Sequence, residues 1–223
     1  MRKFLPLLLC FSFFIACSSN AEQPHEKKYA KAVVAIPADT NFHEGDIIFQ
    51  TSQSGQSQAI QLATHSKYSH CGLLFKDNEK WFVYEAIQPV QKTPFNEWIL
   101  RGDDQFYIVR RLKDADSLLT PAVLMKMRSF ISKQLGKNYD LAFDWSDERM
   151  YCSELVWKTY HEATGLEIGK TKPLDEYDLG SPLVKTSLEK RYGKNIPYKA
   201  PMISPGSIFD SELLVTVRTG SGK

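Results

Sequence analysis

Residues 68–86 read YSHCGLLFKDNEKWFVYEA and contain two strand-like runs separated by a short polar segment. Residues 69–75 and 81–86 are mostly apolar, whereas residues 76–79 are polar and rich in turn formers. Two such runs around a short polar segment are typical of a β-hairpin.

The pairing of these strands places a histidine beside a carboxylate. With Asp77 and Asn78 as the two turn residues, His70 lies directly opposite Glu85. Directly opposed residues share a face, with Cβ atoms about 4.5–5.5 Å apart. A carboxylate there fixes the tautomer of the imidazole and stabilises its protonated form. A slip of one residue would put the two side chains on opposite faces.

A second stretch, MYCSELVW at residues 150–157, begins an apolar pattern with helical spacing. It predicts a helix over residues 151–164, closed by Gly165, with Cys152 at its N-terminus. The helix dipole and the free N–H groups at that end stabilise a thiolate, and they can also hold an oxyanion. A thiol at a helix start and a histidine on a sheet form the arrangement of a cysteine hydrolase.

Four segments carry a resemblance to a known family: GDIIF (45–49), YSHCG (68–72), YEA (84–86) and YCSEL (151–155). In this order they resemble the YaeF/YiiX family of permuted papain-like enzymes, over roughly residues 42–217. The histidine precedes the cysteine, as in the circularly permuted branch. The resemblance implies an α+β fold, with an antiparallel sheet or open barrel packed against the nucleophile helix.

The resemblance also implies roles and chemistry. Cys152 would be the nucleophile, His70 the general base and Glu85 the orienting residue. The reaction would be hydrolysis or transfer at an amide, thioester or ester, with no metal or organic cofactor.

The remaining pattern also favours an α+β fold, because strands come first and helices are interspersed later. We expect strands at residues 45–50, 106–112 and 212–218, helices at residues 54–65 (with Ser54 near the N-cap) and 120–135, and a loop-rich region at residues 166–205.

The first residues are typical of a targeting signal. Residues 1–16 combine a basic start with an apolar run too short to span a bilayer, and Cys17 follows. This resembles a bacterial lipoprotein signal, which implies a lipid on Cys17, a tether over residues 17–41, a catalytic domain over residues 42–218 and a tail over residues 219–223. The protein would then face the periplasm, anchored in the outer membrane more readily than in the inner one.

Composition narrows the function classes further. The chain has 223 residues and a net charge of +2, and Arg2 and Lys3 account for that excess. A neutral domain gives no electrostatic reason to expect nucleic acid as a partner. Of the four cysteines, Cys71 and Cys152 remain for the folded domain. We expect Cys71 in the core, and a disulfide between the two stays open.

Several other interpretations stay open. Tyr68, Tyr151 and Ser153 could bind substrate or donate to an oxyanion, although aromatic packing explains the tyrosines equally well. A zinc site would have to draw on His65, His70, Cys71 and Cys152, whose spacing matches no familiar ligand pattern. No Gly-x-Ser-x-Gly elbow surrounds Ser153, so a serine hydrolase has little support.

The leading hypothesis is a lipid-anchored cysteine hydrolase of the cell envelope that cleaves an amide, with wall peptides as the nearest substrate. An acyltransferase or thioesterase would use the same three residues and favour an apolar pocket, with residues such as Leu166, Ile168 and Leu174 covering it. The alternative from another class is a noncatalytic envelope lipoprotein with an unreactive, buried Cys152.

Overall fold

The structure is a computed structural model and describes residues 41–222. These residues fall within one compact unit of the chain. The expected signal segment, Cys17 and nearly all of the expected tether lie outside the described residues.

The described part is built on a six-stranded sheet in the order β4-β3-β2-β1-β5-β8, in which every neighbouring pair is antiparallel. A second sheet pairs β6 with β7. The strands are β1 (Ile47–Gln50), β2 (His70–Asp77), β3 (Lys80–Glu85), β4 (Gln91–Pro94), β5 (Tyr107–Leu112), β6 (Lys172–Pro173), β7 (Pro201–Met202) and β8 (Leu214–Gly220).

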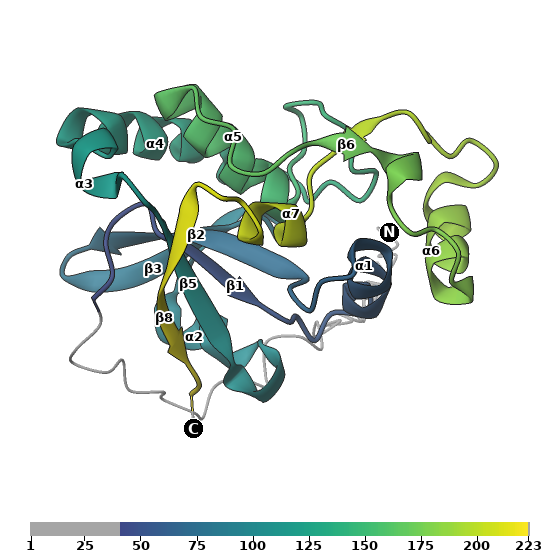
Figure 1. Cartoon of the computed structure of the whole chain (residues 1–223), viewed down its shortest axis with the longest axis horizontal. Helices are drawn as coiled ribbons and strands as arrows, with labels where there is room; N and C mark the ends of the chain where they lie inside the picture. Colours follow the sequence, from purple (N-terminus) through teal and green to yellow (C-terminus); the bar gives the residue numbers. More distant parts are fainter. Residues whose placement is uncertain (1–40, 223) are drawn as a thin grey trace, which may run out of the picture. The chain divides into compact units, whose positions relative to one another are not determined.

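Helices lie on both faces of the sheet (Figure 1), with α4 and α5 on one side and α2 on the other, while α1 and α6 lie beyond the end of β1. The helices are α1 (Ser57–Thr64), α2 (Phe95–Leu100), α3 (Ala115–Leu118), α4 (Pro121–Gln134), α5 (Cys152–Thr164), α6 (Pro182–Tyr192) and α7 (Pro205–Phe209), with 3₁₀ turns η1 (Asp103–Gln105) and η2 (Leu174–Glu176).

Alternate side chains of the central strand pack into two hydrophobic cores, one on each face of the sheet. In β1, Ile47 and Phe49 pack in the core formed with α4 and α5, whereas Ile48 packs in the core formed with α2. Because successive side chains of a strand point to opposite faces, a sheet covered on both sides needs apolar residues at every position. This explains the apolar run at residues 47–49 in β1.

The expected α+β architecture, with an antiparallel sheet packed against the helix that begins at Cys152, is confirmed. Helix α4 begins where its sequence signals predict, since Thr120 Oγ1 accepts from the N–H of Val123 and Pro121 occupies the first turn. Helix α5 ends at Gly165, whose φ of 75° lies in the left-handed region that favours glycine.

The predicted register of the hairpin is wrong by two residues. Asn78 and Glu79 form the turn, with φ of 46° and 63°, and Asp77 pairs with Lys80. Two left-handed residues give a turn whose twist matches that of the strands. The side-chain period of a strand is two, so the shift leaves every side chain on its expected face.

Other expectations also need correction. Helix α1 begins at Ser57, and Ser54 is not its N-cap. The region 166–205, expected to be loop-rich, contains α6, which begins at Pro182 behind an N-cap bond from Val184 N–H to Ser181 Oγ of 3.2 Å. Its prolines suggest loops in the sequence, but proline also suits the first turn of a helix. Strand β4 and helix α2 have no counterpart among the expected elements.

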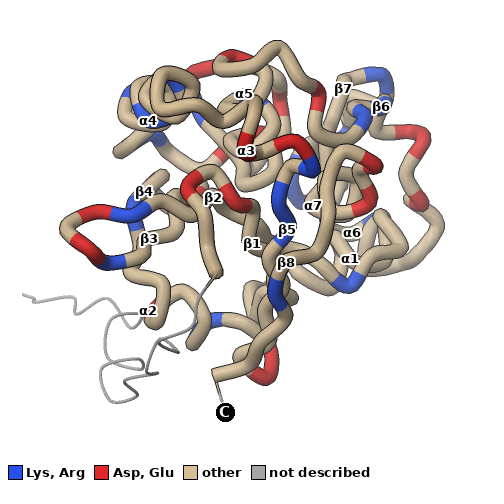
Figure 2. Tube along the Cα trace, turned by 60° about the vertical axis from the view of Figure 1, so that its left-hand side comes forward, with Lys and Arg blue, Asp and Glu red and all other residues tan. Residues whose placement is uncertain are grey.

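Charges of both signs are interspersed along the described part of the chain (Figure 2). Figure 2 shows acidic and basic positions next to each other at the turn between β2 and β3, where Lys92 Nζ lies 2.6 Å from Asp77 Oδ2. None of the helices in residues 41–222 is long and apolar enough to cross a membrane.

We predict that Gly72→Ala destabilises the fold by about 1–3 kcal/mol, because overpacking a tight core forces backbone shifts. A Cβ at position 72 would lie 2.5 Å from Val83 Cγ1 and 2.8 Å from the carbonyl oxygen of Tyr84. Urea unfolding of the variant measures the loss. Gly55→Ala is the control, since nothing lies within 4 Å of its added Cβ. Equal midpoints for the two variants would contradict the packing argument.

Candidate active site

Cys152 is the first residue of α5, and its position is fixed by the start of that helix. The N–H of Tyr151 donates to Glu154 Oε2 at 3.2 Å, and Glu154 Oε1 lies 2.8 Å from Lys158 Nζ. These bonds hold the first turn, whose remaining free N–H groups point toward the N-terminal end. The Cys152 side chain is buried, yet it lines a pocket.

His70 and Glu85 are joined by a short hydrogen bond, although they are not opposite each other in the sheet. His70 Nε2 lies 2.6 Å from Glu85 Oε2, and both side chains are buried. The register places Glu85 at the level of Gly72, so the bond runs diagonally across the strands. Diagonal neighbours on one face remain within reach of long side chains. The Trp98 ring stacks against the imidazole, with centroids 6.0 Å apart.

The second oxygen of Glu85 has two partners that the sequence did not reveal. Thr93 Oγ1 donates to Glu85 Oε1 at 2.5 Å, and the guanidinium of Arg101 also donates to it. Thr93 lies on β4 and Arg101 follows α2, and neither element is among the sequence-based expectations. No sequence signal linked either residue to the site.

The thiol of Cys152 has two hydrogen-bonding neighbours, His70 and Cys71. Because Nε2 of His70 faces Glu85, Nδ1 is the ring nitrogen left for the thiol. Burial by itself lowers the pKa of His70, but the bonds with Cys152 and Glu85 outweigh it and raise that pKa to about 9.

The contact that raises the pKa of His70 lowers the pKa of the Cys152 thiol. The hydrogen bond from Cys71 holds the pKa of Cys152 well below its ordinary value, against the effect of burial, and His70 contributes to the lowering. Burial raises the pKa of Glu85, but the hydrogen bond with His70 and the charge of Arg101 lower it overall. The geometry therefore favours a thiolate–imidazolium pair beside an ionised carboxylate.

Cys71 is buried in the core, as expected, and it also reaches the nucleophile. Cys71 and Cys152 are both free thiols. Burial raises the pKa of Cys71, and so does its contact with Cys152, so it remains a thiol that can donate. The sequence indicates only a core residue or a disulfide partner at this position, and the contact with the nucleophile is a finding of the structure.

The three residues considered for substrate or oxyanion contacts occupy different places. Tyr68 packs against Phe209, with ring centroids 4.2 Å apart, and does not line the pocket. Tyr151 and Ser153 line it, but both bind Ile203: Tyr151 Oη accepts from its N–H at 3.2 Å, and Ser153 Oγ donates to its carbonyl at 2.9 Å. Their hydroxyls thus fix the segment that carries Ile203.

Tyr139 is a candidate that sequence reasoning missed. Its hydroxyl accepts a hydrogen bond from Gln56 Nε2 at 3.2 Å, which leaves its own hydrogen free to donate. Burial raises the pKa of Tyr139 well above its usual value, and the nearby charge of Cys152 adds to the effect. A neutral phenol beside the thiol is suited to donate to an oxyanion. Its sequence neighbours carry no pattern that would have identified it.

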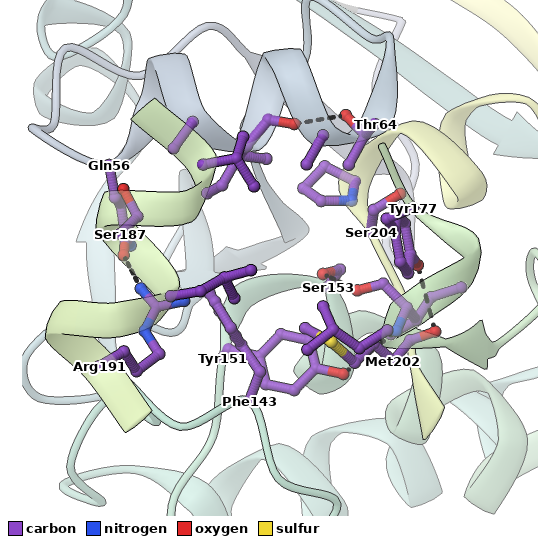
Figure 3. Close-up of a pocket in the computed structure, with 18 of the residues that line it drawn as sticks. Gln56, Thr64, Phe143, Tyr151, Ser153, Tyr177, Ser187, Arg191, Met202 and Ser204 are labelled. Atoms are coloured by element: carbon purple, nitrogen blue, oxygen red, sulfur yellow. Dashed lines mark hydrogen bonds between the residues drawn. The ribbon is translucent and has the colours of Figure 1, made fainter. Parts of the chain in front are cut away.

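The pocket beside Cys152 is mostly apolar and is built from segments far apart in sequence (Figure 3). Leu174 lines it as expected, whereas Leu166 and Ile168 pack in the main core instead. Its lining residues are Gln56, Ala59, Ile60, Ala63, Thr64, Tyr139, Phe143, Tyr151, Cys152, Ser153, Leu174, Tyr177, Leu179, Val184, Ser187, Leu188, Arg191, Met202, Ile203, Ser204 and Pro205.

The residues weighed for a zinc site do not form one. Across residues 41–222, no three His, Cys, Asp or Glu side chains gather in a geometry that could hold a metal ion. His65 is exposed, and its Nε2 lies 3.2 Å from Asp178 Oδ2, separate from His70.

Three comparisons with known proteins agree on the family and the fold. A family model described as permuted papain-like amidase enzyme, YaeF/YiiX, C92 family, matches residues 41–218. The uncharacterized protein YiiX of Escherichia coli K12 is 48% identical over 186 residues, which span 83% of this chain and 91% of that protein. The crystal structure of metalloprotein YiiX from Escherichia coli O157:H7 matches with a TM-score of 0.76 at 47% identity, over 80% of this chain and 98% of that one.

We predict that iodoacetamide labels Cys152 with a pH midpoint well below the ordinary thiol value of about 8.5. His70→Ala should raise the midpoint, because it removes the positive partner of the thiolate. A midpoint that rises by about one pH unit would lower the labelling rate at acidic pH about tenfold. Mass spectrometry across pH assigns each thiol, and Cys71 should react far more slowly.

His161→Ala is the matched control, because His161 lies on the same helix but stacks on Trp157 with ring centroids 4.8 Å apart. An unchanged midpoint in His70→Ala would contradict the ion pair.

Proposed function

Because the chain belongs to the YaeF/YiiX family of permuted papain-like amidases, we propose that it is a cysteine amidase that works through Cys152, His70 and Glu85. The observation that carries the proposal is the 2.6 Å bond between His70 Nε2 and Glu85 Oε2, in a histidine that also hydrogen-bonds the Cys152 thiol. A nucleophile, a base and an orienting carboxylate are the parts that covalent acyl transfer requires.

The chemistry follows from the charges of these groups. The Cys152 thiolate attacks the amide carbonyl, and the N–H groups at the start of α5 stabilise the resulting oxyanion. His70, protonated in the resting pair, gives its proton to the leaving amine, and a thioester to Cys152 remains. His70 then takes a proton from water, which attacks the thioester and releases the acid. Glu85 stabilises the imidazolium of His70, both in the resting pair and after His70 has taken the proton from water.

The substrate we propose is an amide of the cell envelope, with wall peptides as the first class to test. Its basis is the expected lipid on Cys17, which would hold the domain at a membrane facing the periplasm. Acyl chains on one residue give stable anchoring without a spanning helix. The expected outer-membrane location rests on the same signal.

A second candidate function has one observation in its favour, the apolar lining of the pocket at Cys152. An acyltransferase or thioesterase would place an acyl chain there, and an acyltransferase would pass the acyl group to an acceptor other than water. Product ratios with water and an added amine separate hydrolysis from transfer. A noncatalytic role would require an unreactive Cys152, and the thiol labelling described above tests it.

The related YiiX protein of Escherichia coli O157:H7 is described as a metalloprotein. In residues 41–222 of this chain, the His70 and Glu85 side chains are bonded to each other, and no three His, Cys, Asp or Glu side chains are placed so that they could hold a metal ion. The residues here do not fit a metal site, so no step is assigned to a metal.

We predict that Cys152→Ser and His70→Ala each lower amide hydrolysis at least a thousandfold, on the order seen when one residue of a triad is removed, since such residues act as a unit. The assay is release of amine from muropeptides and N-acyl amides by the full chain, read by liquid chromatography and mass spectrometry. Intact-mass analysis should detect the acyl-enzyme on Cys152. Full activity in both variants would refute the proposal.

We also predict that Cys17→Ser abolishes both lipid labelling and recovery in the membrane fraction. Cys17 is the residue that the lipoprotein signal would modify, whereas Cys10 lies within the apolar run that would be removed. Metabolic labelling with a fatty acid provides the measurement, with Cys10→Ser as the control. Equal fatty-acid labelling of the two variants would contradict the assignment of the lipid to Cys17.

A further inference from the structure

The pocket beside Cys152 contains one residue that its apolar lining does not explain. Arg191, in the last turn of α6, is the only Lys, Arg, Asp or Glu among the described residues that line the pocket. Arginine stays protonated at any physiological pH. Arg191 is half-buried, and its positive charge lies in a lining that contains no carboxylate to balance it.

The contacts of Arg191 leave its charge without an acidic partner. Its Nη2 donates to Gln56 Oε1 at 3.1 Å, and its guanidinium lies over the Phe143 ring, 4.2 Å from the centroid. Within the described part of the chain, no carboxylate forms an ion pair with it. The neighbouring Asp140 and Asp144 pair with Arg149 instead.

Arg191 is also connected to the reacting end of the pocket. Gln56 accepts from Arg191 through Oε1 and donates to the Tyr139 hydroxyl through Nε2. The guanidinium is thus linked to Tyr139 by two side-chain hydrogen bonds. The charge of Cys152 contributes to the raised pKa of the Tyr139 hydroxyl. In Figure 3, Gln56 and Arg191 lie at the opposite end of the view from Met202 and Ser204.

We propose that Arg191 is a specificity-determining residue that binds a carboxylate of the substrate whose carbonyl Cys152 attacks. The proposal rests on the proposed function and adds a substrate class to it: amides that also carry a carboxylate. Phe143 and Gln56 hold the guanidinium in place, and its remaining N–H groups can form a paired hydrogen bond with a carboxylate.

A purely structural role predicts a different behaviour. A positive charge in the last turn of a helix stabilises the helix dipole, and Lys190 next to Arg191 already provides one. Arg191 lines the pocket, whereas Lys190 is exposed and does not. Loss of a structural contact would lower the reaction rates of all ligands alike, whereas loss of a carboxylate site would lower only the rates of ligands that carry a carboxylate.

The test uses iodoacetamides as probes of the full chain. One series carries a carboxylate on linkers of increasing length, from a single methylene upward, and the matched series carries a carboxamide. In each case the Cys152 thiolate forms an S–C bond and iodide leaves. Mass spectrometry gives the second-order rate for Cys152. We expect the carboxylate to react about tenfold faster than its carboxamide at the best linker length, as one charge-assisted pair would give.

The variants separate the possible explanations. Arg191→Gln should abolish the carboxylate preference, so that the two series react at equal rates within that variant, Arg191→Lys should retain part of the preference, and the control Lys190→Gln should retain all of it. The inference is overturned if no linker length favours the carboxylate, or if Arg191→Gln keeps the preference, while plain iodoacetamide still labels Cys152. A Cys152 that resists plain iodoacetamide would instead overturn the proposed function, and this inference with it.

Discussion

The enclosed carboxylate of Glu85 is the constraint on which the site depends. A charge with no exposed surface must be neutralised by groups that surround it, because its hydration is lost. His70 on β2, Thr93 on β4 and Arg101 after α2 supply those groups. Three strands and a helix are therefore fixed relative to one another by one side chain. Removing any partner would leave part of a buried charge unpaired.

The reactivity of Cys152 follows from that arrangement. With Nε2 of His70 held by Glu85, the other ring nitrogen is left for the thiol, and the Cys71 thiol approaches from the same strand. Helix α5 contributes its N-terminal N–H groups, and Glu154 keeps its first turn closed. In the proposed mechanism, thiolate stabilisation and oxyanion binding thus share one structural origin, the packing of the start of α5 against the start of β2.

The pocket is lined by the start of α5 and by a further pair of helices. These helices, α1 and α6, share a small core around Ala59, Val184 and Leu188. This core is separate from the two that cover the sheet. Under the proposed function, the sheet and α5 hold the reacting groups, and α6 brings Arg191 to the same pocket.

Local rules determined much of this protein from sequence alone. Alternation placed His70 and Glu85 on one face even though the register was wrong by two residues, since the period of a strand is two. Capping and apolar spacing placed Cys152 at a helix start, and the motif order indicated the family. The tertiary structure alone decided the partners of Glu85, the contact of Cys71 with the nucleophile and the approach of Arg191 to Gln56. These contacts join residues far apart in the chain, and packing of distant segments leaves no periodic trace in sequence.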